Sequence, residues 1–147
     1  MLKLFITSTV TAETLTEARI ISAFEEKDFY LYYFIQLYKG RTLIFCNSIS
    51  CVRRLTQLLT LLQCQPLPFH ANMNQRQRLK NLDRFREDPC GLLLATDVAA
   101  RGLDIPDVQY VVHYQVPRTS EVSNKLKHIY IFVFFCGLDL CIFANLM

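Results

Sequence analysis

The feature of this sequence that most constrains its fold is the alternation of short apolar runs with longer amphipathic segments. Residues 42–47, 91–96 and 110–114 are apolar runs of strand length. Between such runs, apolar residues recur every three or four positions, as they do in helices with one buried face. Strands that alternate with helices predict right-handed crossovers, so we expect an α/β fold in three layers, with one parallel sheet and helices on both faces.

The same patterns place the individual elements along the chain. We expect strands at 18–24, 42–47, 91–96 and 110–114, and an extended piece at 66–70. We expect helices at 26–38, 49–62 and 74–89, and a short helix between the last two strands. The third long helix has Asn74 as its predicted N-cap. Three apolar residues mark its expected buried face: Leu79, Leu82 and Phe85.

Composition excludes several classes of site. The chain has 147 residues, 52% of them hydrophobic, which suits a single domain with a core. Its six cysteines form no C-x-x-C pair and have no histidine at zinc-finger spacing, so we expect reduced thiols and no metal site. With only four glycines, the sequence contains no G-x-x-x-x-G-K-S/T loop to hold phosphates.

The character of the sequence changes near Ser123. Residues 129–147 are mostly apolar, aromatic or β-branched, and their number is close to what crosses a membrane. A tail anchor is therefore one interpretation, although Asp139 near its middle would cost about 2.5–3.5 kcal/mol on insertion. We divide the chain into an N-terminal lead-in at 1–17, a domain at 18–122 and an unrelated hydrophobic tail at 123–147. A domain that ends there would leave an open sheet edge beside the strand at 110–114.

Polar side chains gather where the predicted strand at 91–96 ends, which is the side where open parallel sheets bind ligands. Thr96 offers a hydroxyl, Arg101 a guanidinium and Asp104 a carboxylate, with Gly102 between the last two. This set suits a ribose-phosphate ligand. An ordinary strand-to-helix turn explains the same residues equally well.

Positive charge gathers in the predicted helix at 74–89. Gln75 and Arg78 lie one turn apart at its start, where they could contact successive phosphates or sugars of a nucleic acid. A solvated helix face is the commoner explanation of such a run. The formal net charge of +3 does not decide between the two, because the distribution of charge matters more than its sum.

Four phrases, in this order and spacing, resemble motifs IV, IVa, V and Vb of the DEAD-box RNA helicases: LIFCNS, HANMNQRQR, LLLATDVAARGLDIPDV and VVHYQVP. The resemblance covers about 18–122. The phrases EKDFYLYYF, NSISCVRRL and HYQVPRTSEV are similar to the DEAD-box helicase 24 branch, which is associated with large-subunit ribosome biogenesis. The resemblance implies the second RecA-like lobe, of the P-loop NTPase type, of an ATP-dependent RNA helicase located in the nucleolus.

The resemblance also implies roles for single residues. It assigns RNA contacts to Ser48, Gln75, Arg78 and Thr96. It places Asp104 on the ATP ribose with Gly102 beside it, and Arg101 at the link between the nucleotide site and RNA. The implied partners are RNA and the first helicase lobe, which would also hold the Mg²⁺ that accompanies ATP.

Two departures from the family pattern bear on activity. The sequence contains no first lobe, and after Val122 it does not continue into the arginines of motif VI. An arginine of this kind contributes about 10³–10⁵ to the rate of phosphoryl transfer, so we expect the C-terminally incomplete lobe to be inactive alone. The alternatives are a non-catalytic fragment that binds RNA or a helicase, and a membrane protein anchored through 129–147.

Overall fold

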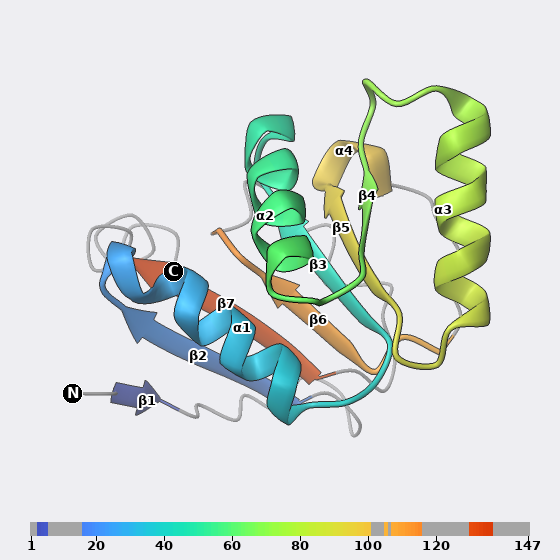
Figure 1. Ribbon diagram of the computed structural model, residues 1–147. Coiled ribbons are helices and arrows are strands. Elements are labelled where there is room, and N and C mark those ends of the chain that lie inside the picture. Colours follow the sequence, from blue (N-terminus) through green and yellow to red (C-terminus); the bar gives the residue numbers. More distant parts are fainter. Residues whose placement is uncertain (1–2, 6–15, 101–104, 106, 116–129, 137–147) are drawn as a thin grey trace.

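One seven-stranded sheet forms the centre of the computed structural model, in the order β1-β2-β7-β6-β3-β5-β4 (Figure 1). The structure describes residues 3–5, 16–100, 105, 107–115 and 130–136. The strands are β1 (Lys3–Phe5), β2 (Thr16–Ser22), β3 (Thr42–Cys46), β4 (Pro66–Phe69), β5 (Leu92–Thr96), β6 (Tyr110–His113) and β7 (Tyr130–Cys136). The helices are η1 (Phe24–Glu26), α1 (Lys27–Leu37), α2 (Ile49–Leu61), α3 (Gln75–Glu87) and α4 (Asp97–Ala100).

Every strand pair is parallel except β1 with β2, so the predicted parallel sheet is confirmed. Side chains alternate along β3: Ile44 and Cys46 belong to one apolar cluster, and Leu43 and Phe45 to another. The first cluster packs against α1 and α2 and the second against α3 and α4, which confirms the three layers. All five residues of β3 are buried, as expected of a strand covered on both faces.

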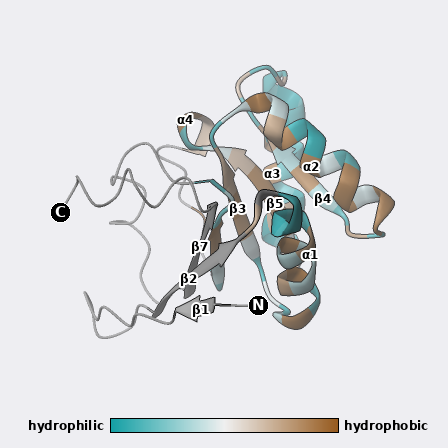
Figure 2. Cartoon of the chain, turned by 90° about the vertical axis from the view of Figure 1, so that its left-hand side faces the viewer, coloured by the Kyte–Doolittle hydropathy of each residue, from teal (hydrophilic) through white to brown (hydrophobic). Residues whose placement is uncertain are grey.

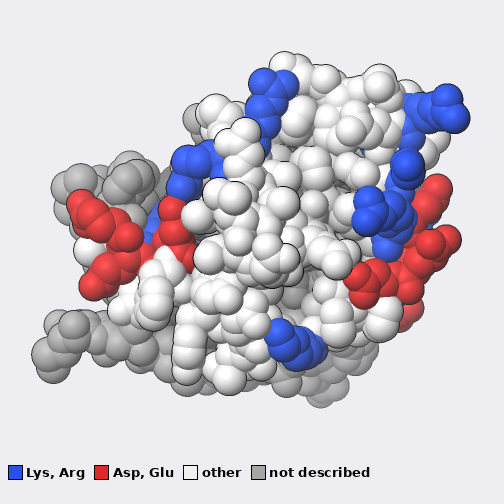
Figure 3. Space-filling model, in the orientation of Figure 1, with Lys and Arg blue, Asp and Glu red and all other residues white. Residues whose placement is uncertain are grey.

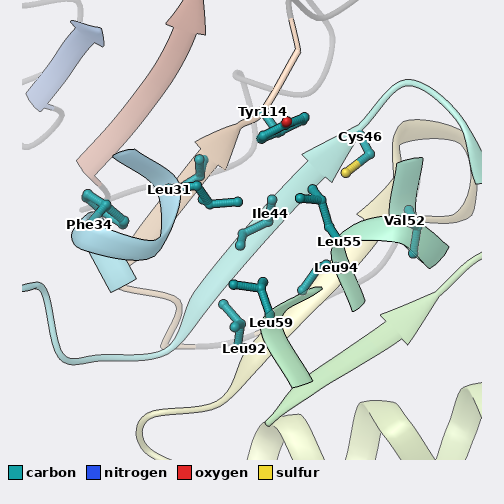
Figure 4. Close-up of a cluster of buried hydrophobic side chains, with 11 residues drawn as sticks. Leu31, Phe34, Ile44, Cys46, Val52, Leu55, Leu59, Leu92, Leu94 and Tyr114 are labelled. Atoms are coloured by element: carbon teal, nitrogen blue, oxygen red, sulfur yellow. The ribbon is translucent and has the colours of Figure 1, made fainter. Parts of the chain in front are cut away.

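The first cluster shows how α2 is held to the sheet. Leu55 and Leu59 lie on one side of this helix and are fully buried. Figure 4 shows them reaching toward Ile44 of β3 and Leu94 of β5. Figure 2 shows both hydrophobic and hydrophilic residues on the helices, as expected where one face is covered and the other meets water.

One expectation about the buried face of α3 needs correction. Leu79 was expected on the buried face of α3, but its side chain is half exposed, whereas Leu82 and Phe85 are buried as predicted. Asn81 is buried instead, and its side-chain amide donates to the carbonyl of Pro68 at 2.9 Å. A helix can bury a polar residue when that residue finds a hydrogen-bond partner, and a hydrophobic pattern does not reveal such a partner.

The expected open edge beside Tyr110–Tyr114 was wrong. β7 pairs in parallel with β6 on one side and with β2 on the other. The physical reason is that an apolar, aromatic and β-branched run is also what a central parallel strand requires. The boundary at 122/123 stays a prediction, since 116–129 lie outside the described residues. In the described part of the chain, no helix is both long and apolar enough to traverse a bilayer.

The register brings the carboxyl ends of the strands together. Cys46 of β3 is paired with Thr96 of β5, and Phe45 with His113 of β6. Phe69 of β4 is paired with Ala95, one residue before Thr96. We call the ends of β3, β4, β5 and β6, with the residues that directly follow them, the carboxyl edge. The chain leaves four neighbouring strands at this edge, so side chains from distant parts of the sequence meet there.

Candidate nucleic-acid interface

Ser48 lies at the carboxyl edge, two residues after β3, and begins α2 as its N-cap. Its backbone is extended, and its hydroxyl oxygen accepts a hydrogen bond from the backbone amide of Cys51 at 3.2 Å. Capping uses the oxygen as an acceptor and leaves the hydroxyl proton able to donate, for example to the Oγ of Ser50 at 3.0 Å. The exposed Ser48 can therefore offer a proton to an anionic ligand.

Asn74 fixes the start of α3 at the same edge. Its side-chain oxygen accepts from the backbone amide of Gln77 at 2.8 Å, which confirms the predicted cap. The cap places Gln75 and Arg78 in the first turn of the helix, where the two side chains are 3.4 Å apart from Oε1 to the guanidinium. Gln75 is exposed and Arg78 half-buried.

The position of Arg78 is set by Phe69, the last residue of β4. The guanidinium carbon lies 4.9 Å from the centre of the Phe69 ring, a cation–π distance. The Nε atom of Arg78 is buried and has no hydrogen-bond partner within the described residues. A guanidinium fixed over an aromatic ring loses less freedom when it binds an anion.

Thr96 ends β5 and directly precedes α4. Its side chain is largely buried, and its register partner is Cys46. The structure thus places four of the predicted site residues at one edge of the sheet: Ser48, Gln75, Arg78 and Thr96. The other three, Arg101, Gly102 and Asp104, lie outside the described residues, and their placement stays a prediction.

Two positive charges act on His70, the residue that follows β4. The pKa of His70 is lowered by burial and by the positive charges of Arg53 and Arg78. Arg53 was missed by the sequence analysis, although its position one turn beyond the start of α2 places it near the carboxyl edge. On the face shown in Figure 3, acidic groups lie only toward the left and right margins, whereas basic groups lie at the top, beside the acidic groups and near the bottom.

A polar network holds the two helices on one face of the sheet together. Arg54 of α2 donates to both carboxylate oxygens of Asp28 in α1, at 2.6 and 3.0 Å, and to the hydroxyl of Tyr114 at 2.8 Å. The Tyr114 hydroxyl in turn donates to Asp28 at 2.6 Å. These bonds hold the pKa of Asp28 below its usual value, chiefly through Arg54. The network fixes α2, and with it Ser48, against the rest of the domain.

His113 is a buried polar residue with a different environment. Its ring stacks on Phe45 with centroids 5.2 Å apart, and neither ring nitrogen has a hydrogen-bond partner in the described part of the chain. Burial lowers its pKa to about 4. A neutral, unpartnered imidazole between strands and helices is part of the core. Among the described residues, no three histidine, cysteine or acidic side chains are grouped to hold a metal ion.

Comparison with known proteins identifies the family to which this domain belongs. Residues 26–130 match the family model for the helicase conserved C-terminal domain. The chain is 63% identical over 113 residues to the ATP-dependent RNA helicase DDX24 of Homo sapiens, covering 76% of this chain and 13% of that protein. It is 45% identical over 111 residues to the ATP-dependent RNA helicase mak5 of Schizosaccharomyces pombe, covering 76% and 17%. The chain thus spans about an eighth to a sixth of the length of these curated relatives.

Solved structures show the same fold. The E. coli DEAD-box protein SrmB, bound to regulator of ribonuclease activity A, superposes with a TM-score of 0.72 at 25% identity, covering 89% of this chain and 81% of that one. Domain 2 of the DEAD-box helicase Mss116p, bound to an RNA duplex, gives a TM-score of 0.68 at 26% identity, with coverages of 86% and 56%. The C-terminal domain of the DEAD-box protein Dbp5 gives 0.75 at 20% identity, with coverages of 90% and 83%.

Proposed function

Because this chain belongs to the DEAD-box RNA helicases, as a helicase conserved C-terminal domain, we propose that its carboxyl edge binds the sugar-phosphate backbone of RNA. The observation that carries the proposal is the convergence of Ser48, Gln75, Arg78 and Thr96, from three separate segments, on one edge of the sheet. The family resemblance had assigned RNA contacts to the same four residues.

The chemistry of these side chains fits a backbone ligand. Phosphate oxygens are acceptors, and Arg78 supplies a charged donor fixed over Phe69. The hydroxyls of Ser48 and Thr96 and the amide of Gln75 add neutral donors, of the kinds that contact phosphates and sugars. Such contacts position the protein on RNA without reading the base sequence, so we expect little preference among single-stranded sequences.

The nucleotide part of the proposal rests on the family resemblance. Asp104 would hold the ribose of ATP with Gly102 beside it, and Arg101 would link this site to the RNA. ATP supplies the free energy of the helicase cycle when it is bound between two lobes, and the first lobe is the partner that would hold Mg²⁺. By the same resemblance, we propose that this helicase activity serves large-subunit ribosome assembly in the nucleolus.

Alone, the 147-residue chain hydrolyses no ATP under this proposal. Its sequence contains no phosphate-binding loop and no motif VI arginines, which position and stabilise the transferred phosphoryl group. The test is RNA-stimulated phosphate release by the purified chain, compared with the Thr96→Ala, Asp104→Ala double variant. The two should be indistinguishable. Faster release by the unaltered chain would disprove the proposed inactivity.

RNA binding is tested by fluorescence anisotropy with a short, labelled single-stranded RNA. Arg78→Ala should weaken binding. It should also make the fall of log affinity with log salt shallower by about 0.7 in slope, the change expected for one lost phosphate contact on a single strand. Arg84→Ala is the matched control, because Arg84 is exposed on the same helix but lies nearer its other end. Equal effects of the two variants, or no binding by the unaltered chain at low salt, would rule out the proposed interface.

A further inference from the structure

Two consecutive arginines of α2 have opposite environments. Arg54 is bound to Asp28 and Tyr114 by the network described above. Arg53 is exposed, and the structure records no ion pair or hydrogen bond between its side chain and any described residue. Consecutive residues of a helix point about 100° apart, so one arginine can serve the contact with α1 while its neighbour faces elsewhere.

Arg53 faces the β4 side of the helix. α2 packs against β4, and the positive charge of Arg53 acts on His70, the residue that follows β4. Arg78 acts on the same imidazole from α3, which lies on the opposite face of the sheet. Two guanidinium groups, one from each face, therefore flank the turn after β4. Burial and these two charges act in the same direction on His70, which keeps its ring neutral at pH 7.

Bringing like charges together costs free energy unless an anion lies between or beside them. His70 also lacks a hydrogen-bond partner: the residue is 5% exposed, and its buried Nδ1 atom has no partner in the described chain. Arg78 also has an unpartnered buried Nε. Buried polar groups without partners require an explanation. Unlike His113 in the core, His70 and Arg78 lie at the carboxyl edge, where a bound ligand would supply the missing partners. The arrangement fits a polyanion that crosses the carboxyl edge from α3 to α2.

We propose that Arg53 binds an additional RNA phosphate, so that the RNA backbone runs from Arg78 across the turn after β4 to the first turns of α2. This inference rests on the proposed RNA-binding function and extends it to a residue that none of the four assigned contacts includes. The ligand is a sugar-phosphate chain long enough to span both arginines. A single nucleotide does not meet this requirement.

The test is the salt dependence of RNA affinity for the full 147-residue chain, measured by anisotropy with the same labelled RNA. Arg53→Ala should weaken binding several-fold and make the fall of log affinity with log salt shallower by about 0.7 in slope. Arg53→Lys should restore most of the slope, because a phosphate contact depends mainly on charge. Arg84→Ala should leave both quantities close to those of the unaltered chain. Thermal unfolding of Arg53→Ala should be unchanged, because the side chain is exposed and supports no described contact.

The possible outcomes separate this inference from the function it rests on. If Arg78→Ala weakens binding and Arg53→Ala does not, the path over α2 is wrong while the interface at the carboxyl edge stands. If the unaltered chain binds no RNA, the proposed function fails first. If Arg53→Ala and Arg84→Ala weaken binding equally, Arg53 contributes only to the general charge of the surface, and the additional site is refuted.

Discussion

The buried His113 makes stability depend on pH in a direction that the structure fixes. Its pKa is lowered to about 4 by burial, against an ordinary value of 6.5 in an unfolded chain. Between pH 6.5 and pH 4 the unfolded state takes up a proton that the folded state excludes. The contribution of His113 to the free energy of unfolding is therefore fully present above about pH 6.5 and is lost as the pH falls toward 4. Since one pKa unit corresponds to about 1.4 kcal/mol, the loss assigned to this residue reaches about 3 kcal/mol.

The perturbation that isolates this effect is His113→Phe, which keeps an aromatic ring against Phe45 and removes the titrating group. The assay is the free energy of unfolding from urea titrations between about pH 7 and pH 4. The unaltered chain should lose up to about 3 kcal/mol more than the variant over this range. His70, whose pKa is also lowered, is present in both proteins, so its contribution cancels in the comparison. Parallel stability curves, or an NMR-measured pKa of His113 near 6.5, would refute the reasoning.

Two further predictions concern the elements that position the interface. Asn74→Ala removes the cap of α3, so it should lower the free energy of unfolding by about 1 kcal/mol and weaken RNA binding. Asn74→Ser keeps a capping side chain and should preserve both stability and binding. Equal behaviour of the two variants would contradict the role given to the cap. Asp28→Asn should cost about 1–2 kcal/mol at pH 7, because Asp28 accepts three hydrogen bonds in a partly exposed network. This cost should vanish as the pH falls through the lowered pKa of Asp28, below 3.8. The control Asp83→Asn breaks an exposed ion pair with Arg86 at 3.7 Å and should lower the free energy of unfolding by at most about 0.5 kcal/mol. A comparable loss of stability in both variants would show that the network around Asp28 adds nothing.

Hydrophobic periodicity was sufficient to predict the architecture. The strands at 42–46 and 92–96 are buried along their whole length. A central parallel strand, covered on both faces, requires such an apolar run, so the three-layer sheet could be predicted from it. The cap at Asn74 was also predictable, because the side chain of an N-cap bonds to the backbone close by in sequence. The convergence of Ser48 and Thr96 follows from a general property of parallel sheets, whose strands all end on one side.

Other features depended on contacts between distant residues. The composition of the apolar run at 130–136 fits a membrane anchor, an unrelated hydrophobic tail or a buried strand. Only its pairing with β2 and β6 shows that this run forms a strand of the sheet. The different environments of Arg53 and Arg54 are set by Asp28 and by His70, which lie far from them in sequence. The sequence shows two adjacent arginines but not which residues the fold brings near each of them. The sequence therefore did not reveal that Arg53 lies near His70 at the carboxyl edge while Arg54 is bound to Asp28.

The most direct test of an RNA interface at the carboxyl edge is a titration of single-stranded RNA into the isotope-labelled chain, followed by the NMR shifts of backbone amides. The largest changes should fall on Thr96 at the end of β5, on the residues that follow β3 and β4, including Ser48 and His70, and on the first turn of α3. The loops at the opposite edge, at Gly40 and Cys90, should change little. Shifts concentrated on that opposite edge, or spread evenly over the surface, would contradict the account.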